Sequence, residues 1–224
     1  MWTRSSRRWL PLADTATFEP VHETGRDAAA PHAHIEHDTN TGISNTKLAM
    51  WLFLGSECLL FGALLTTYLL YKNPLPGQGP TREQLFDIPF TSASSFVLLM
   101  SSLTMVLAVA AIERSDHHRM RIWLGATAVL GSLFIAGQIY EFTTFYAEGL
   151  GYTTSRFGSA FYTLTGFHGV HVTAGIIMLV SLLLWSLRGN LPEHRSETVE
   201  VVGLYWHFVD VVWIVLFAVV YLIP

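Results

Sequence analysis

Leu204–Val212 reads Leu-Tyr-Trp-His-Phe-Val-Asp-Val-Val and lies inside an apolar run that continues to the end of the chain. His207 and Asp210 stand where a membrane helix ordinarily carries only hydrocarbon. Their spacing of three places them on one helical face, with Trp206 and Trp213 nearly in line. Because polar groups are costly in lipid, we expect this face to contact protein.

The composition places the chain among integral membrane proteins. Of 224 residues, 51% are hydrophobic and 13% are charged, against about 25% charged in an ordinary soluble domain. Mean hydropathy is +0.39, and the small net charge of −4 gives no indication of nucleic-acid binding. The single cysteine, Cys58, excludes an intrachain disulfide and a cysteine metal cluster.

Five long apolar segments predict an all-α, polytopic bundle of five transmembrane helices in a domain over 45–224. Each segment reaches the ~20 residues that a spanning helix needs. An odd number of spans puts the two ends of the chain on opposite sides of the membrane. The expected helices run approximately over 46–71, 91–112, 122–147, 159–187 and 200–223.

Basic residues predict the orientation of these spans, because cytoplasmic loops are enriched in Lys and Arg. With the N-terminus inside, ten of the 13 basic residues fall on the inner side. The other three, Lys72, Arg82 and Arg156, fall on the outer side. We therefore expect a cytoplasmic N-terminus and place Pro224 outside.

Residues 1–44 form a polar leader that we expect to be disordered, since it shows no apolar periodicity. Ser6–Leu10 superficially resembles a twin-arginine export signal, but the apolar stretch after it is far shorter than the required length of about 7–15 residues. His32, His34 and His37 suggest a weak metal site. A tail without preorganisation favours ordinary solvated histidines instead.

Ionisable side chains inside the spans are the candidate functional residues. Glu57 lies near the bilayer midplane of the first span, where a carboxylate costs on the order of 3 kcal/mol. Two interpretations stay open for it: a functional group, or a protonated acid in a purely structural hydrogen bond to a neighbouring helix. Gln138 and Glu141, three residues apart near the outer end of the third span, favour an interhelical hydrogen bond over catalysis.

Two histidines, His168 and His171, lie three residues apart on the fourth span. As metal ligands they would need a defined set of further ligands, so Glu141, His207 or Asp210 would have to converge on them. Interhelical hydrogen bonding across glycine-rich contacts is the alternative that we favour.

Small and weakly polar residues on the second and third spans predict close helix packing rather than chemistry. They are Thr91, Ser92, Ser94, Ser95, Ser101, Ser102 and Thr104 on the second span, and Gly125, Gly131 and Gly137 on the third.

Four motifs together closely resemble subunit III of the haem–copper oxidases. They are Trp51–Glu57, Gln138-x-x-Glu141, Gly158–Val172 and Tyr205–Trp213. The motifs follow the family's order on consecutive spans, and the resemblance covers roughly residues 44–224. Glu57 falls where that family keeps a membrane-embedded carboxylate.

The chain departs from the longer members of that family, which have seven spans. It begins at what looks like their third span and is similar to the five-helix bacterial members. The first two spans of the longer members form a lipid-holding cleft with the other five. That cleft is therefore not carried over whole, and the resemblance leaves open whether subunit I supplies the missing pair.

The resemblance implies a non-catalytic accessory subunit of a proton-pumping terminal oxidase in aerobic electron transport. It implies haem and copper in partner subunits and no cofactor in this chain, apart from bound phospholipid. The implied partners are subunit I as the main contact, subunit II, other subunits and membrane lipids, and the implied location is a bacterial inner membrane with a periplasmic C-terminus. The residues carried over as polar or proton-related are Glu57, Gln138, Glu141, His168, His171, His207 and Asp210.

Alternative functions fit the same residues. Cytochrome c is the expected electron donor, with a quinol oxidase or a nitric oxide reductase complex as alternatives. A stand-alone five-helix transporter is a competing class, but no span contains an internal proline and no inverted repeat is evident. At the second inner loop, Glu113, Asp116, His117 and His118 suggest proton collection, or an ordinary solvated loop, which we favour.

Overall fold

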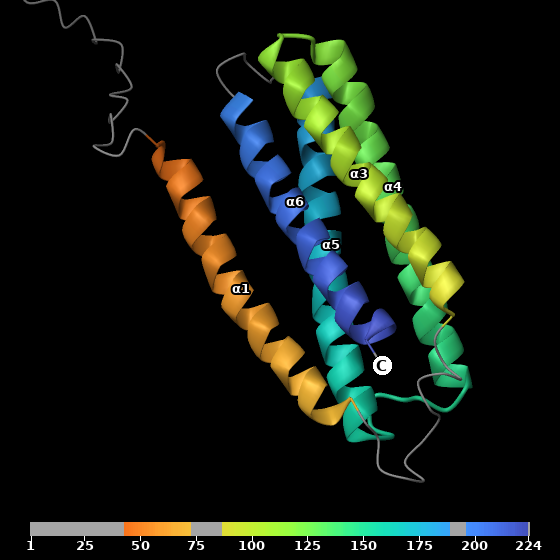
Figure 1. The fold of residues 1–224 in the computed structure, drawn as a ribbon. Helices are drawn as coiled ribbons and strands as arrows, with labels where there is room; N and C mark the ends of the chain where they lie inside the picture. Colours follow the sequence, from red (N-terminus) through yellow and green to blue (C-terminus); the bar gives the residue numbers. More distant parts are fainter. Residues whose placement is uncertain (1–42, 73–86, 189–195, 224) are drawn as a thin grey trace, which may run out of the picture. The chain divides into compact units, whose positions relative to one another are not determined.

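The computed structural model describes residues 43–72, 87–188 and 196–223. Five helices in this part are long and apolar enough to cross a membrane, which confirms the predicted all-α architecture. The twin-arginine-like motif and the histidine cluster of the leader lie outside the described residues. The helices are α1 (Asn45–Tyr71), α3 (Ile88–Glu113), α4 (His117–Ala147), α5 (Arg156–Leu187) and α6 (Ser196–Phe217), the last continuing as the π-helix η2 (Ala218–Leu222) (Figure 1).

Three helices begin earlier than their apolar runs because a polar residue caps each one. The side chains of Asp87, Asp116 and Ser155 each accept a hydrogen bond from the backbone N–H three residues later, at 3.0–3.2 Å. Such caps satisfy donors that the first helical turn leaves free. His117 and His118 therefore lie in the first turn of α4, and the loop expected there is shorter.

The C-terminal helix α6 packs against α3, α5 and α1, while α4 packs against α3 and α5 (Figure 1). Among the spans, α6 is the most buried and α1 is the least buried. The stretch around His207 and Asp210 is therefore enclosed by other helices. The prediction that this face contacts protein is confirmed, since Trp206, Asp210 and Trp213 are each at most 4% exposed.

Two glycines make room for the indole of Trp206. A Cβ atom on Gly131 of α4 would lie 2.6 Å from its Cη2, and a Cβ on Gly175 of α5 would lie 2.8 Å from its Cε3. Both distances are far inside van der Waals contact, so only glycine admits the ring from either side. One side chain of α6 thereby fixes the approach of α4 and α5.

The first helix is held to the bundle by a narrow stripe of buried residues and by polar contacts at its N-terminal end. Lys47 pairs with Glu200 of α6 at 2.5 Å, and Ser44 hydrogen-bonds Glu197. The wide remaining face of α1 exposes apolar side chains. The buried residues of α1 lie on the opposite stripe, recur every seven positions and are Leu54, Phe61 and Tyr68.

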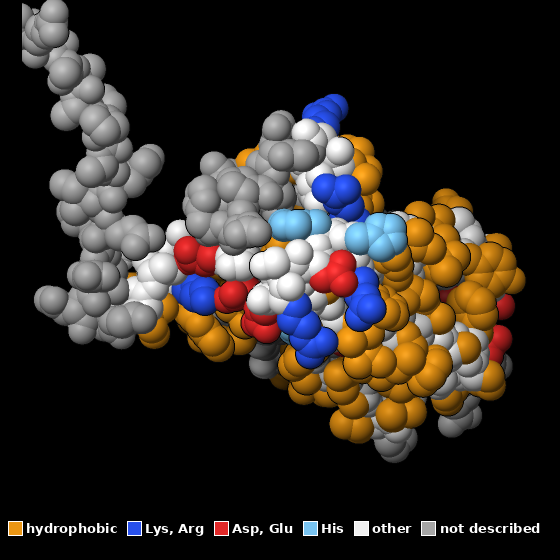
Figure 2. Space-filling view, turned by 90° about the horizontal axis from the view of Figure 1, so that it is seen from above, with side chains coloured by type: hydrophobic (Ala, Val, Ile, Leu, Met, Phe, Trp, Pro, Cys, Tyr) orange, Lys and Arg blue, Asp and Glu red, His pale blue; other side chains and the backbone are white. Residues whose placement is uncertain are grey.

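Charged and histidine side chains gather at one end of the bundle (Figure 2). This end holds the N-termini of α1, α4 and α6 and the C-termini of α3 and α5 (Figure 1). The described basic residues near it are Lys47, Arg114, Arg119, Arg121 and Arg188, whereas Lys72 and Arg156 lie near the other end.

Candidate functional site

Two tryptophans of α6 donate hydrogen bonds to two serines of α3. Trp206 Nε1 lies 3.0 Å from Ser101 Oγ, and Trp213 Nε1 lies 2.8 Å from Ser95 Oγ. Each serine hydroxyl in turn donates to a backbone carbonyl of α3, at 2.6 and 2.7 Å. The small polar face of the second span thus accepts specific partners in addition to permitting close packing.

His207 and Asp210 meet the same α3 residue. His207 Nδ1 lies 2.7 Å from Ser102 Oγ, and the carboxyl group of Asp210 faces the same hydroxyl. The predicted shared face is therefore real. Its histidine and its acid are directed to a neighbouring helix of this chain.

Glu141 forms the predicted interhelical hydrogen bond. Its Oε1 accepts from the hydroxyl of Thr91 on α3, and its Oε2 accepts from Gln138 Nε2 at 2.9 Å. Tyr221 of η2 lies against the same cluster. Both carboxyl oxygens of a buried acid are satisfied here, which favours a structural role for Glu141.

Replacing Thr91 by valine is expected to lower stability by about 1–3 kcal/mol, because it leaves Glu141 Oε1 buried without its donor. Thr91→Ser keeps a hydroxyl and is the matched control. The thermal midpoint of the purified protein in detergent measures both. Equal midpoints for Thr91→Val and Thr91→Ser would show that this hydrogen bond contributes nothing.

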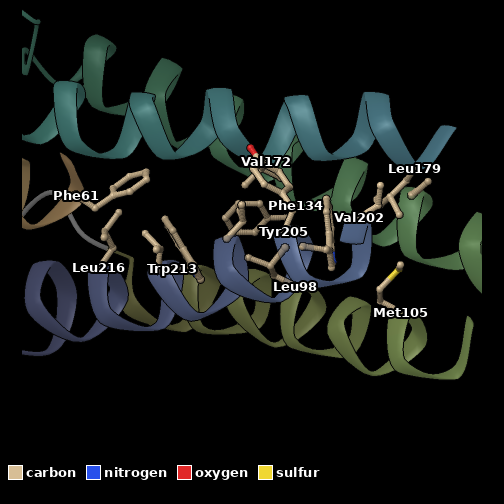
Figure 3. Packing of buried hydrophobic residues seen from close by; sticks show 14 of the residues in the cluster. Phe61, Leu98, Met105, Phe134, Val172, Leu179, Val202, Tyr205, Trp213 and Leu216 are labelled. Carbon is tan, nitrogen blue, oxygen red and sulfur yellow. The ribbon is translucent and has the colours of Figure 1, made fainter. Parts of the chain in front are cut away.

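His168 lies in an aromatic enclosure and is 0% exposed. Its ring stacks on Trp213 with centroids 4.9 Å apart, and it makes T-shaped contacts with Phe134 and Phe61 at centroid distances of 6.0 and 6.5 Å. Figure 3 shows these three aromatic residues within the buried cluster. Neither ring nitrogen has a hydrogen-bond partner among the described residues, so the hydrogen bond expected for His168 is not found there.

His171, one turn further along α5, does make an interhelical contact. Its Nε2 lies 3.1 Å from Glu57 Oε2, and both side chains are at most 15% exposed. Its Nδ1 lies 2.7 Å from the backbone oxygen of Phe167. Phe61 of α1 makes a T-shaped contact with the imidazole, with ring centroids 5.1 Å apart. Glu57 and His171 therefore join α1 to α5 within the span.

The two hydrogen bonds of His171 are compatible with two placements of the protons on this pair. A carbonyl only accepts, so Nδ1 of His171 must carry the proton that is donated to Phe167. The contact between Nε2 and Glu57 then needs one further proton, carried either by the carboxyl group or by the imidazole. Both arrangements are neutral as a pair, which explains how an acid and a histidine are accommodated in a membrane span.

The ligand set that a metal at His168 and His171 would require is not assembled. In the described ranges, no three side chains of His, Cys, Asp or Glu converge. Glu141 turns to Thr91, and His207 and Asp210 turn to α3. The two histidines themselves point into different surroundings, since His168 contacts aromatic rings and His171 contacts Glu57.

The sequence alone did not single out the partners of these residues. Ser95 and Ser101 are six residues apart, and Trp206 and Trp213 are seven residues apart. These similar spacings, each close to two helical turns, were the available signal. For Glu57, nothing local indicates His171, because the two are 114 positions apart.

Comparisons with known proteins agree with this geometry. The model of the family described as "Cytochrome c oxidase subunit III" matches residues 4–223. Cytochrome c oxidase subunit 3 from Bacillus sp. (strain PS3) is 43% identical over 80% of this chain and 86% of the relative. The protein of that name from Synechocystis sp. is 44% identical over 95% of this chain and 88% of the relative. Cytochrome bo(3) ubiquinol oxidase subunit 3 from Pseudomonas aeruginosa is 36% identical over 90% of this chain and 92% of the relative.

The match covers nearly the whole chain and includes every span. The relatives are named as third subunits of oxidases that use different electron donors. The chain belongs to the cytochrome c oxidase subunit III family, the accessory subunits of haem–copper oxidases.

Proposed function

We propose that this chain packs against subunit I of a proton-pumping terminal oxidase, stabilises it during turnover and supports proton uptake. The observation that carries the proton role is the partly buried contact between Glu57 of α1 and His171 of α5, whose Oε2 and Nε2 atoms lie 3.1 Å apart. Haem and copper belong to partner subunits in this proposal.

We further propose that the charged end of the bundle faces the cytoplasm of a bacterial cell, with the C-terminus in the periplasm. Support comes from the gathering of basic side chains at that end (Figure 2). Asp116, His117 and His118 lie at the same end, where Asp116 caps α4 and the favoured interpretation of all three is an ordinary solvated surface. Phospholipid would cover the exposed apolar face of α1.

Cytochrome c is the proposed electron donor, since two relatives at 43% and 44% identity are named cytochrome c oxidase subunit 3. The relative named as a ubiquinol oxidase subunit, at 36%, keeps a quinol as the second candidate. Turnover of the purified complex with each donor separates the two. If the partner complex has the optical spectrum and activity of a nitric oxide reductase, the oxidase assignment is replaced, whichever electron donor is used.

Glu57→Gln and Glu57→Ala in the assembled oxidase test the proton role. Glutamine still donates to a neutral His171 but cannot give up a proton to it, whereas alanine removes both abilities. We expect both variants to shorten the turnover lifetime severalfold and to slow proton uptake, measured with a pH-sensitive dye.

If only Glu57→Ala shortens the lifetime, the pair has a structural role and no proton role. Unchanged lifetime and uptake in both variants would leave Glu57 without a role beyond packing. Recovery of the tagged chain without a larger haem protein would favour a stand-alone transporter over the accessory function.

A further inference from the structure

The N-terminal half of α1 has little buried surface to hold it in place. Leu54 is the first buried residue of this helix, and Phe61 and Tyr68 follow at intervals of seven. Lys47 lies seven positions before Leu54, so it continues the same stripe toward the bundle. Glu57 lies one turn after Leu54. Its position relative to α5 therefore depends on how the N-terminal half of α1 is seated.

Lys47 ties α1 to other helices at the charged end of the bundle. Its Nζ lies 2.5 Å from Oε2 of Glu200 on α6. Glu197 of α6 and Glu113 of α3 also interact electrostatically with this ammonium group. Ser44 accepts a hydrogen bond from the backbone N–H of Lys47 at 3.2 Å and hydrogen-bonds Glu197. The start of α1 is thus held by a group of charges contributed by two neighbouring helices.

Tyr205 of α6 contacts both helices that carry the acid and the histidine. Its hydroxyl donates a hydrogen bond to the backbone oxygen of His171 on α5, at 3.0 Å. Its ring stacks on Phe53 of α1, with centroids 6.3 Å apart. Phe53 lies one turn before Glu57. The same helix, α6, therefore contacts α1 and α5 on either side of the Glu57–His171 contact.

The contact between Glu57 and His171 depends strongly on helix position. Its two atoms lie 3.1 Å apart, and a further separation of about 0.5 Å would take them out of hydrogen-bond range. Releasing the end of a helix with few buried residues allows that helix to tilt. Such a tilt changes the separation between Oε2 and Nε2.

We propose that Lys47, through its ion pair with Glu200, is a positioning residue for Glu57, and that Tyr205 positions His171 to meet it. The inference rests on the proposed proton role of Glu57 and adds the residues that set its geometry. The side chains of Lys47 and Glu200 are 39% and 30% exposed. An ion pair at such a surface adds little stability, so its loss should move α1 without unfolding the bundle.

Lys47→Met in the assembled oxidase tests the proposal. The infrared carboxyl band of Glu57, assigned by its loss in Glu57→Gln, reports the hydrogen bond to His171. This band should shift in Lys47→Met and keep its wild-type position in Lys47→Arg and in Lys47→Glu/Glu200→Lys. Arg119→Met is the matched control, because Arg119 forms its 3.2 Å ion pair with an acid three residues away at the start of α4. An unshifted band in Lys47→Met, or an equal shift in the control, would overturn the proposal.

Tyr205→Phe tests the second half of the proposal. Phenylalanine keeps the ring that stacks on Phe53 and removes the donor to the backbone of His171. The infrared band of Glu57 should shift in this variant too, with chain yield and helicity verifying that it folds. A band at the wild-type position would overturn the role of Tyr205.

A double-mutant cycle on turnover lifetime shows whether Lys47 acts through Glu57. Lys47→Met should shorten the lifetime severalfold in the wild-type background and have no further effect beside Glu57→Gln. Equal shortening in both backgrounds would overturn the proposal, because Lys47 would then act independently of Glu57. If the band shifts but neither variant changes the lifetime, the proposed proton role fails while the positioning role stands.

Discussion

Replacing Gly175 by alanine is expected to destabilise the bundle by about 1–3 kcal/mol. The new methyl group would lie 2.8 Å from two atoms of the Trp206 ring. That ring is 1% exposed and rigid, and its Nε1 is hydrogen-bonded to Ser101 at 3.0 Å. It has no free direction in which to move, since Gly131 bounds its other edge. Gly131→Ala should have an effect of the same size.

The thermal midpoint of the purified protein measures this effect, with Gly62→Ala as a control that meets no atom within 4 Å. Trp206→Leu combined with Gly175→Ala should cost less than the sum of the two single changes, because the clash disappears with the ring. A midpoint for Gly175→Ala equal to that of the control would show that α5 shifts away without cost.

Replacing Glu57 alone by leucine should destabilise the protein by about 1–3 kcal/mol, because it leaves His171 Nε2 without its partner inside the span. His171→Leu should act similarly by isolating the acid. The double variant Glu57→Leu/His171→Leu should recover most of this loss, since replacing both partners of a buried polar pair by apolar groups is often nearly neutral.

Hydrogen exchange of the α1 backbone and the thermal midpoint measure this cycle. The single variants should speed exchange in α1, which has few buried residues to hold it, and the double variant should return it toward wild type. Additive losses in the double variant would mean that the two side chains act independently. A double variant that is stable but has a short turnover lifetime would separate the pair's proton role from its structural role.

Hydropathy and motif order alone predicted the five spans and the family to which this chain belongs. An apolar segment long enough to cross a bilayer must form a helix, since lipid offers no partner for backbone N–H and C=O groups. Helix starts were less predictable, because caps such as Asp116 lie in polar sequence beyond the apolar run. The enclosure of Trp206, Asp210 and Trp213 was also predictable, because a polar face in a membrane has the lowest free energy when other helices cover it.

Only the tertiary structure decided which polar groups meet. Their spacing places His168 and His171 on a common face of α5. Nevertheless, the neighbouring helices surround His168 with aromatic rings and bring a carboxyl group to His171. The glycines show the same limit, since Gly175 receives the Trp206 ring while Gly169 faces open space. Local sequence determines where a helix lies and which face is polar. The partner of each side chain depends on contacts between distant segments, which no local pattern encodes.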